Sequence, residues 1–267
     1  MSTMPATNSP SAIILAAGKG TRMKSDLPKV VHPIGGRPMV CAVVDACLAV
    51  GCSRIVVIVG YKQEDVRSAL QGYEGKYNIE YAVQDQQLGT GHAVQCCAAA
   101  FEQSNFAGDT LVLCGDGPLI RPVTLEKVLK RHRDHKASAT LATAVLDDAT
   151  GYGRIYRGSD GKFKAIVEQK NCSPEQLAIK EVNPSYYCFN TRDLFASLKK
   201  VQKNPVSGEY YLTDTLSLLL DEKKTVEVIE AVPPEDVLSI NTLEDLAKVD
   251  AIYRSRPAVQ VPAGGHR

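Results

Sequence analysis

Glycine and basic residues directly follow a short apolar run near the start of the chain. Residues 13–17 (Ile-Ile-Leu-Ala-Ala) are apolar, which predicts a buried strand of a parallel sheet. Residues 18–24 then supply two glycines, Thr21 and three basic side chains, among them Arg22, and Lys29 follows shortly after. Glycines let backbone N–H groups approach an anion, and guanidinium and ammonium groups bind phosphate oxygens. This pattern predicts a phosphate-bearing ligand at the carboxyl end of the first strand.

Two common phosphate-binding motifs fit this loop poorly. Met23 stands where a dinucleotide-binding fingerprint needs its third glycine, and no Gly-Lys-Ser/Thr sequence follows Gly18 at the spacing of a P-loop. The plain alternative is a solvated basic turn without a ligand.

Asp116 is the acidic residue best placed to work with this loop. It follows the apolar residues 111–114, so it should project from the same edge of the sheet as the loop after residue 17. A carboxylate facing phosphate oxygens needs a cation between them, and Mg²⁺ binds few protein carboxylates while taking other ligands from phosphate and water. The alternative is an aspartate in a tight turn between Gly115 and Gly117.

Residues 84–90 (Gln-Asp-Gln-Gln-Leu-Gly-Thr) form a polar turn with amide side chains and little charge. Amide donors and acceptors suit the edge of a nucleobase better than an ion. A polar surface loop is the simpler reading of the same residues.

The loop resembles a known signature. Leu-Ala-Ala-Gly-Lys-Gly-Thr-Arg-Met at residues 15–23, followed by Leu-Pro-Lys at 27–29, resembles the sugar-phosphate nucleotidyltransferases, most closely the bacterial N-acetylglucosamine-1-phosphate uridyltransferases. That family forms UDP-N-acetylglucosamine and pyrophosphate from UTP and N-acetylglucosamine 1-phosphate. The resemblance covers about residues 12–255 and implies the pyrophosphorylase domain only, since nothing after residue 256 resembles the β-helix acetyltransferase domain of the commoner bacterial form.

The resemblance implies roles for particular residues. Arg22, Lys29 and Asp116 match catalytic positions, and Asp116 with Asn241 matches the pair that holds Mg²⁺ in the family. From its own position before the last helix, Asn241 could equally be a turn residue. The resemblance further implies nucleotide contacts from Leu15, Ala16, Ala17, Gly18, Lys19, Gly20, Thr21, Gln84, Gln87, Gly89, Thr90 and Gly115.

The second half of the chain matches the sugar side of the family. The residues implied to contact the amino sugar are Gly153, Glu168, Asn183, Tyr211 and Thr213. One departure concerns the residues after Asn183, where the family usually has Thr-Gly and this chain has Pro184 and Ser185. Proline fixes φ and removes an N–H, and serine replaces a residue that is free to take unusual torsions.

The expected reaction is in-line attack of the sugar 1-phosphate on the α-phosphorus of UTP. A phosphate monoester is already mostly dianionic at neutral pH, so positioning and charge neutralisation are what the protein must supply. Three alternatives remain. A related nucleotidyltransferase could use another sugar 1-phosphate, such as glucose 1-phosphate, or another NTP. The second alternative is a catalytically silent nucleotide-sugar-binding protein. The third is a Rossmann oxidoreductase, which Met23 disfavours.

Composition limits the partners. The 267 residues carry a net charge of +1 and 44% hydrophobic residues, so the chain can bury a core but has no overall attraction for nucleic acid or membrane. No apolar run reaches the length of a membrane span. The eight cysteines form no C-x-x-C pair and read as reduced, buried thiols. We expect a cytoplasmic protein with small-molecule substrates, and the sequence predicts no oligomer.

Alternating strands and helices predict an α/β fold with a Rossmann-like, doubly wound, mostly parallel sheet and a smaller β-rich, sugar-binding part. We expect a disordered leader at 1–10, a nucleotide-binding half at 11–136, a sugar-binding half at 137–240, a closing helix at 242–256 and a disordered tail at 257–267. The predicted strands are 13–17, 54–59, 79–83, 110–114, 138–146, 154–156, 163–168, 180–189 and 225–232. The predicted helices are 38–51, 63–71, 92–101, 191–201, 211–220 and 242–254, the last capped by Thr242 with Asp245.

Overall fold

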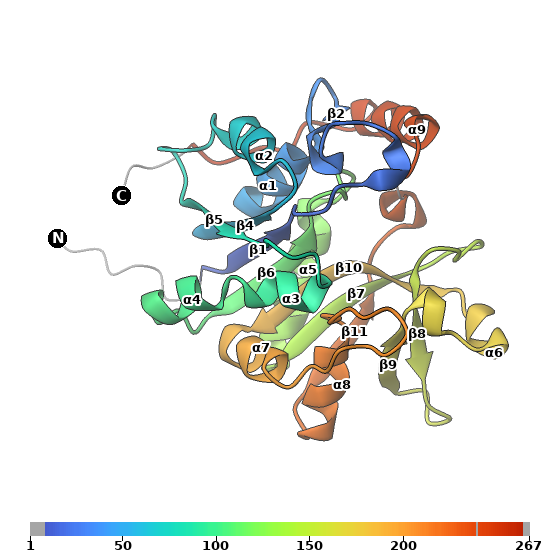
Figure 1. Ribbon diagram of the computed structural model, residues 1–267. Helices are drawn as coiled ribbons and strands as arrows, with labels where there is room; N and C mark the ends of the chain where they lie inside the picture. The colour runs from blue at the N-terminus through green and yellow to red at the C-terminus, as the bar shows by residue number, and fades with distance from the viewer. Residues whose placement is uncertain (1–8, 239, 264–267) are drawn as a thin grey trace.

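The computed structural model describes residues 9–238 and 240–263, which form a central sheet covered by helices (Figure 1). The strands are β1 (Ser11–Leu15), β2 (Pro33–Ile34), β3 (Arg37–Pro38), β4 (Arg54–Val59), β5 (Ile79–Val83), β6 (Asp109–Cys114), β7 (Ala139–Val145), β8 (Gly153–Arg157), β9 (Phe163–Val167), β10 (Glu181–Asn190) and β11 (Val226–Glu230). The helices are α1 (Met39–Ala49), α2 (Gln63–Leu70), α3 (Thr90–Gln95), α4 (Ala98–Ser104), α5 (Pro122–Asp134), α6 (Pro174–Leu177), α7 (Thr191–Leu198), α8 (Asp214–Asp221) and α9 (Leu243–Arg254).

The main sheet has the strand order β11-β7-β10-β6-β1-β4-β5, with β8 and β9 attached beside β10. β10 pairs antiparallel with both β6 and β7, whereas β1 pairs parallel with β4 and β6, and β7 parallel with β11. Along this path β10 is therefore the one strand that runs against the others. The predicted mostly parallel α/β sheet is confirmed, and the β8–β9 hairpin is the β-rich addition.

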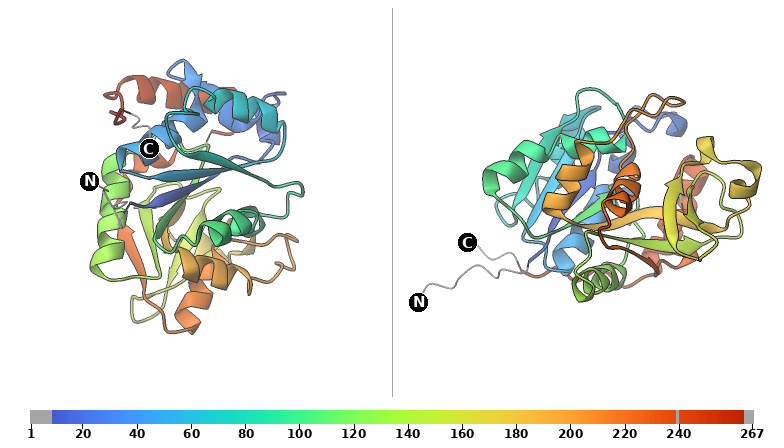
Figure 2. Two further views of the ribbon diagram at one scale, coloured as in Figure 1. Left: turned by 90° about the vertical axis from the view of Figure 1, so that its left-hand side faces the viewer. Right: turned by 90° about the horizontal axis from the view of Figure 1, so that it is seen from below.

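Helices cover both faces of the sheet, so the buried residues form two cores (Figure 2). On one face α1, α2, α5 and α9 pack over strand residues such as Ile14 and Val57. On the other face α3, α4, α7 and α8 pack over the alternate residues, such as Ile13 and Val56. A strand covered on both faces must be apolar at every position, which explains the continuous apolar runs in the sequence.

The pairing of β1 with β6 positions the candidate site. Leu15 lies opposite Cys114 at the carboxyl ends of the two strands, and the Gly115 N–H donates to the Leu15 carbonyl at 2.9 Å. The loop after β1 and the turn after β6 therefore leave the sheet side by side, at the edge where open α/β sheets bind ligands.

Two predicted helices differ from those observed. Residues 92–101 divide into α3 and α4 because Cys96 and Cys97 donate to carbonyls three residues back, which tightens the turn between them. The helix expected from Tyr211 begins at Asp214 instead. The residues expected to form its first turn bond to another segment instead, since the Leu212 N–H donates to the Thr90 hydroxyl.

Smaller differences concern short elements and one helix start. Pro38 is the N-cap of α1 and not its first helical residue. The β2–β3 hairpin was not predicted, although Gly35 and Gly36, both with positive φ, are a known signal for a tight hairpin turn. The predicted Thr242–Asp245 capping box at the start of α9 is confirmed.

The predicted disordered ends need correction where the structure describes them. Pro10 is buried, and its carbonyl accepts the Ser53 N–H at 3.0 Å. In the predicted tail, Val261 packs against the core and the Pro262 carbonyl accepts the Tyr77 hydroxyl at 2.7 Å. Residues 9–10 and 257–263 therefore follow defined paths on the protein, because contacts with distant parts of the chain, not visible in the composition, hold them. Residues 1–8 and 264–267 lie outside the described residues.

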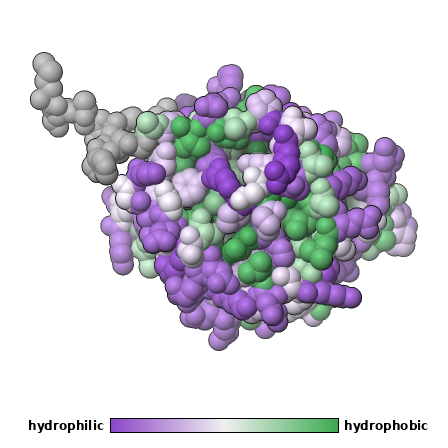
Figure 3. Space-filling view, turned by 90° about the horizontal axis from the view of Figure 1, so that it is seen from above, coloured by the Kyte–Doolittle hydropathy of each residue, from purple (hydrophilic) through white to green (hydrophobic). Residues whose placement is uncertain are grey.

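The surface is mixed in character. The face seen from above shows hydrophobic residues in separate patches among hydrophilic ones (Figure 3). Among the described residues, none of the helices combines the length and the apolar character that crossing a membrane requires.

Candidate active site

An ion pair links the basic loop after β1 to the turn after β6. The Lys29 ammonium donates to Asp116 Oδ2 at 2.7 Å, and the two side chains are 15% and 34% exposed. Lys29 comes from a short 3₁₀ turn at Lys29–Val31 that follows Pro28. The pair places an ammonium group, which can bind phosphate, next to a carboxylate oxygen, which can bind a metal ion.

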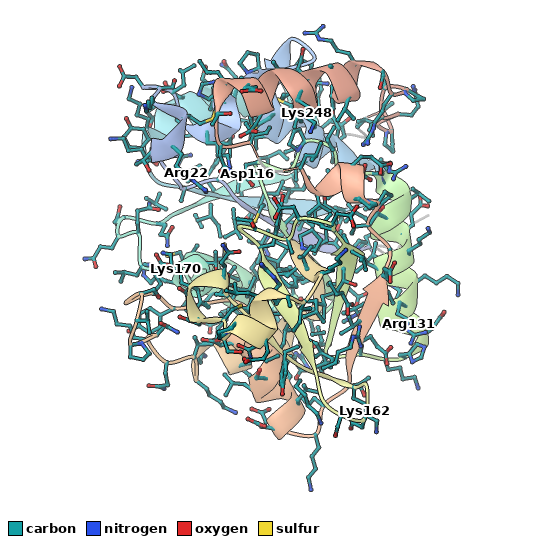
Figure 4. The ribbon with its side chains drawn as sticks, turned by 90° about the vertical axis from the view of Figure 1, so that its right-hand side faces the viewer. Arg22, Asp116, Arg131, Lys162, Lys170 and Lys248 are labelled. Carbon is teal, nitrogen blue, oxygen red and sulfur yellow. The ribbon has the colours of Figure 1, made fainter. Side chains whose placement is uncertain are left out.

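The loop of residues 18–24 wraps over the Lys29 side chain. Gly20 has a φ of +67°, and a Cβ at this position would lie 2.6 Å from the Lys29 Cβ, so only glycine fits. Arg22 is exposed and projects beside Asp116 in the view of Figure 4. Lys19 is also exposed, with its ammonium 5.1 Å from the centre of the Tyr61 ring. The loop thus packs its backbone at Gly20 against Lys29 and exposes two basic side chains, Lys19 and Arg22.

The residues of this loop and strand end have distinct local environments. Ala16 and Ala17 are buried, and their backbones bond to Ile58 and Tyr61, so they fix the path of the chain into the loop. Gly18 and Thr21 are exposed.

A cavity of about 340 Å³ opens beside the ion pair, within the usual size of small-ligand sites. It brings together predicted residues of both halves of the chain. Those that line it are Leu15, Lys29, Thr90, Asp116, Gly153, Glu168, Asn183, Tyr211 and Thr213. Residues from β1, β8 and β10, from the 3₁₀ turn at Lys29–Val31, from the start of α3 and from the loops after β6, after β9 and before α8 therefore converge on one space.

Glu168, which the resemblance predicts to contact the sugar, is one of the acidic residues that line the cavity. Thr213 donates to Glu168 Oε1 at 3.2 Å, and a Cβ on Gly153 would lie 3.6 Å from the carboxylate oxygens. Burial raises the pKa of Glu168, and Asp214 and Glu209 add to the rise. A buried carboxylate held in this way is a strong hydrogen-bond acceptor for hydroxyl groups.

Asn183 lies on β10, where it pairs with Gly153 of β8. The Ser185 N–H donates to Asn183 Oδ1 at 3.0 Å, and Asn183 Nδ2 donates to the Tyr187 hydroxyl at 2.6 Å. Ser185 has a φ of +67°, the left-handed conformation that favours glycine. The position where the resembling family has glycine therefore requires a positive φ here, and serine takes it.

The polar turn of residues 84–90 is fixed by its own amides and by the sugar half. Gln84 is buried, donates to the Gly89 carbonyl at 3.1 Å and contacts His92. Gln87 donates back to the Gln84 carbonyl at 3.4 Å. Gly89, with a φ of +101°, packs so closely on Tyr210 that a Cβ would lie 2.5 Å from the Tyr210 carbonyl. Much of the polarity of this turn therefore holds the turn itself together.

Backbone bonds join this turn to the segment before α8. The Tyr210 N–H donates to the Leu88 carbonyl and the Gly91 N–H to the Tyr210 carbonyl, each at 2.8 Å. The Leu212 N–H donates to Thr90 Oγ1 at 3.1 Å. The predicted base-binding turn and the predicted sugar segment are thus one connected unit.

Asn241 lies at the start of α9, where its N–H donates to Asp245 Oδ2 at 2.9 Å. Asp236 anchors the preceding segment, because this fully buried carboxylate accepts Arg121 and Arg256, each at 2.6 Å. Asn241 is not among the residues that line the cavity, whereas Val237 and Leu238 are.

The structure adds residues that the sequence did not single out. Tyr187 and Asp236 line the cavity. Tyr187 reaches Asn183 through a bulge in β10, and Asp236 is fixed by two distant arginines; neither relationship leaves a local signal in the sequence. Cys114 also lines the cavity, and burial raises the pKa of its thiol to about 12, so it stays protonated and unreactive at neutral pH.

The donor set near Asp116 fits Mg²⁺ rather than a metal held by protein alone. Among the described residues, no group of three or more His, Cys, Asp or Glu side chains could hold a metal ion. Asp116 supplies a partly exposed carboxylate beside the basic loop of residues 18–24. Mg²⁺ commonly takes one or two carboxylates and completes its shell with phosphate oxygens and water.

Comparisons of the sequence identify relatives. The chain is 45% identical over 245 residues to the bifunctional protein GlmU of Exiguobacterium sibiricum, covering 92% of this chain and 53% of that protein. It is 44% identical to the bifunctional protein GlmU of Geobacillus thermodenitrificans, covering 92% of this chain and 52% of that protein. The chain therefore spans about half the length of the curated relatives it matches.

Solved structures share the fold. A putative glucose-1-phosphate thymidylyltransferase from Bacillus anthracis superposes with a TM-score of 0.74 at 22% identity, covering 94% of this chain and 98% of that one. A UDP-glucose pyrophosphorylase complexed with UDP-glucose gives a TM-score of 0.71 at 19% identity, covering 93% and 100%. Residues 11–252 match the family described as nucleotidyl transferase. With its strand-end loop, its ion pair and this match across most of its length, the chain belongs to the nucleotidyl transferase family.

Proposed function

We propose that this protein transfers a uridylyl group from UTP to N-acetylglucosamine 1-phosphate, forming UDP-N-acetylglucosamine and pyrophosphate. The observation that carries the proposal is the Lys29–Asp116 pair at 2.7 Å, placed beside a cavity that also contains Glu168 and Asn183. A phosphate-binding apparatus and a hydroxyl-binding pocket thus share one space. The similarity to the GlmU proteins supports the choice of substrates.

The nucleotide side would act by positioning and charge neutralisation. Lys29 and the exposed Arg22 would bind the β- and γ-phosphates, which leave as pyrophosphate, with the backbone of residues 18–21 beneath them. Asp116 and Asn241 would hold Mg²⁺, which neutralises phosphate charge during phosphoryl transfer. The sugar phosphate attacks as a dianion, so no protein base is required.

The base would bind over the turn of residues 84–90, where Gln84, Gln87, Gly89 and Thr90 are the proposed contacts. The strand-end residues Leu15, Ala16 and Ala17, together with Gly115, would line the nucleoside side. Because this turn is bonded to residues 210–212, base binding and sugar binding would order one connected unit.

The amino sugar would bind between Gly153, Glu168, Asn183 and the segment containing Tyr211 and Thr213. Glu168 would accept sugar hydroxyls, and the Asn183 amide would both donate and accept. Pro184 and Ser185 do not remove the amide from the cavity, since Asn183 and both following residues line it.

We place this activity in the cytoplasm, with UTP and the sugar 1-phosphate as small-molecule partners. All eight cysteines lie in the described part of the chain and are free thiols, which suits a reducing compartment.

The test is pyrophosphate release from UTP and Mg²⁺, with N-acetylglucosamine 1-phosphate and glucose 1-phosphate in parallel. We expect release with the acetylated sugar, lost in Asp116→Ala and kept in the control Asp147→Ala, whose carboxylate is fully exposed beside Lys180. Release with glucose 1-phosphate alone would replace the proposed sugar. UTP binding without release for any sugar would identify a silent nucleotide-sugar-binding protein.

A further inference from the structure

β10 contains an irregularity at the wall of the cavity. The register between β10 and β7 shifts between Val182 and Tyr186, and Ser185 within this bulge takes a φ of +67°. β10 lies between β6 and β7 in the middle of the sheet (Figure 1). A bulge in a central strand re-aims the side chains around it.

The bulge brings together two side chains that a regular strand would keep apart. Residues four apart in an unbroken strand lie about 13 Å from each other along the chain. Here Asn183 Nδ2 donates to the Tyr187 hydroxyl at 2.6 Å. Asn183 is 7% exposed and Tyr187 2% exposed, so the hydrogen bond is shielded from water and has little competition.

The two ends of the Asn183 amide are held by different groups. Oδ1 accepts the Ser185 N–H at 3.0 Å, and Nδ2 donates to Tyr187. A flipped amide would set its NH₂ group against the Ser185 N–H, two donors facing each other. The arrangement therefore selects one orientation and leaves one N–H and one oxygen lone pair of Asn183 for a ligand.

We propose that Tyr187 is a positioning residue for sugar recognition: the Ser185 N–H selects the orientation of the Asn183 amide, the buried Tyr187 hydroxyl holds the Nδ2 end of that amide in place, and the left-handed turn at Ser185 makes both contacts possible. This inference rests on the proposed function, because it assumes that Asn183 contacts the sugar. Tyr187 itself acts through Asn183.

The test compares Tyr187→Phe with Tyr73→Phe. Both substitutions remove one hydroxyl from a buried ring, but the Tyr73 hydroxyl donates to Asp45 and the ring is not among the residues that line the cavity. We expect Tyr187→Phe to raise KM for N-acetylglucosamine 1-phosphate about tenfold, as loss of one buried hydrogen bond would. KM for UTP should stay within about twofold, and Tyr73→Phe should leave both KM values within about twofold.

A double-mutant cycle separates positioning from core packing. If Tyr187 acts through Asn183, Tyr187→Phe should have no further effect on the sugar KM in an Asn183→Ala background. Additive effects, equal rises in both KM values, or a Tyr187→Phe enzyme like the Tyr73→Phe control would overturn the inference while leaving the proposed function intact. A wild-type protein that releases no pyrophosphate with any sugar would overturn the proposed function and this inference with it.

Discussion

The Lys29 ammonium lies 2.7 Å from Asp116 Oδ2, although the two residues are 87 positions apart in the chain. The contact joins the loop after β1 to the turn after β6, whose strands are paired in parallel. Lys29 thus bonds to the same carboxylate that is proposed to hold Mg²⁺. Binding of the metal at this oxygen requires the ammonium to move, and the phosphates of UTP are its natural new partner.

Replacing Lys29 should therefore separate metal binding from turnover. We expect Lys29→Ala to lower kcat by about 100- to 1,000-fold, because a buried donor aimed at developing charge is lost. Without nucleotide, the same variant should bind Mn²⁺ more tightly than the wild type, because the carboxylate has lost its competing cation. Steady-state kinetics and Mn²⁺ titration by electron paramagnetic resonance measure the two effects. Lys130→Ala, on the exposed face of α5, is the control; a near-normal kcat for Lys29→Ala would refute the assignment.

Ser185 offers a test of backbone strain. Both Ser185→Gly and Ser185→Ala remove the hydroxyl, but only glycine relieves the φ of +67°. We expect the glycine variant to be more stable than the alanine variant by about 1 kcal/mol, the cost of a Cβ in the left-handed region. Urea denaturation gives the difference. Equal stabilities would show that the turn carries no strain.

Glu168 should make stability depend on pH. Burial raises the pKa of its carboxyl in the folded state, so ionisation disfavours the fold as the pH rises from the unfolded-state value, about 4.3, toward the folded-state pKa. Glu168→Gln removes this penalty. We expect the variant to melt at a higher temperature than the wild type at pH 7 and at the same temperature below pH about 4, by calorimetry across pH. An identical difference at every pH would mean that ionisation plays no part.

Asp236 should stabilise the fold by anchoring the segment before α9. Its side chain is 1% exposed and accepts both Arg121 and Arg256. Asp236→Asn would leave two guanidinium groups without their shared anion, and we expect a loss of about 2 kcal/mol in the free energy of unfolding. Glu235→Gln, in which an exposed carboxylate 3.8 Å from Arg121 is neutralised, should cost less than about 0.5 kcal/mol. Equal losses in the two variants by urea denaturation would contradict the role of burial.

Several features were predictable because they depend on neighbours in the chain. The β4 and β5 bounds agree with the predicted strands 54–59 and 79–83, and Thr242 with Asp245 forms the expected capping box. The position of Asp116 at the same sheet edge as the loop after β1 followed from one rule, that parallel strands deliver their following loops to the same edge. The spacing of apolar residues and the types of the loop residues suffice to predict such features, because the interactions behind them involve near neighbours in the chain or the same arrangement in every parallel strand.

Other features could not be read in this way. Gln84 turns its amide inward to Gly89, and residues 211–213 leave the helical pattern to pair with Thr90. A specific partner satisfies a polar group in each case, within the same turn for Gln84 and in a distant segment for Leu212, and it outweighs the local preference. The course of residues 257–263 has the same origin, since their composition predicts disorder while Val261 finds a place against the core.

The sequence by itself determined the fold class, the strand-end loop and the acidic residue opposite it, because these depend on apolar periodicity and on glycine and charge at fixed spacings. Only the tertiary structure decided how the residues of β10 that are proposed to contact the sugar are arranged. The contact of Asn183 with Tyr187 depends on a bulge, on a strained φ at Ser185 and on burial between two strands. Such a contact is stable only when the whole sheet is assembled around it, so no local pattern in the sequence of β10 predicts it.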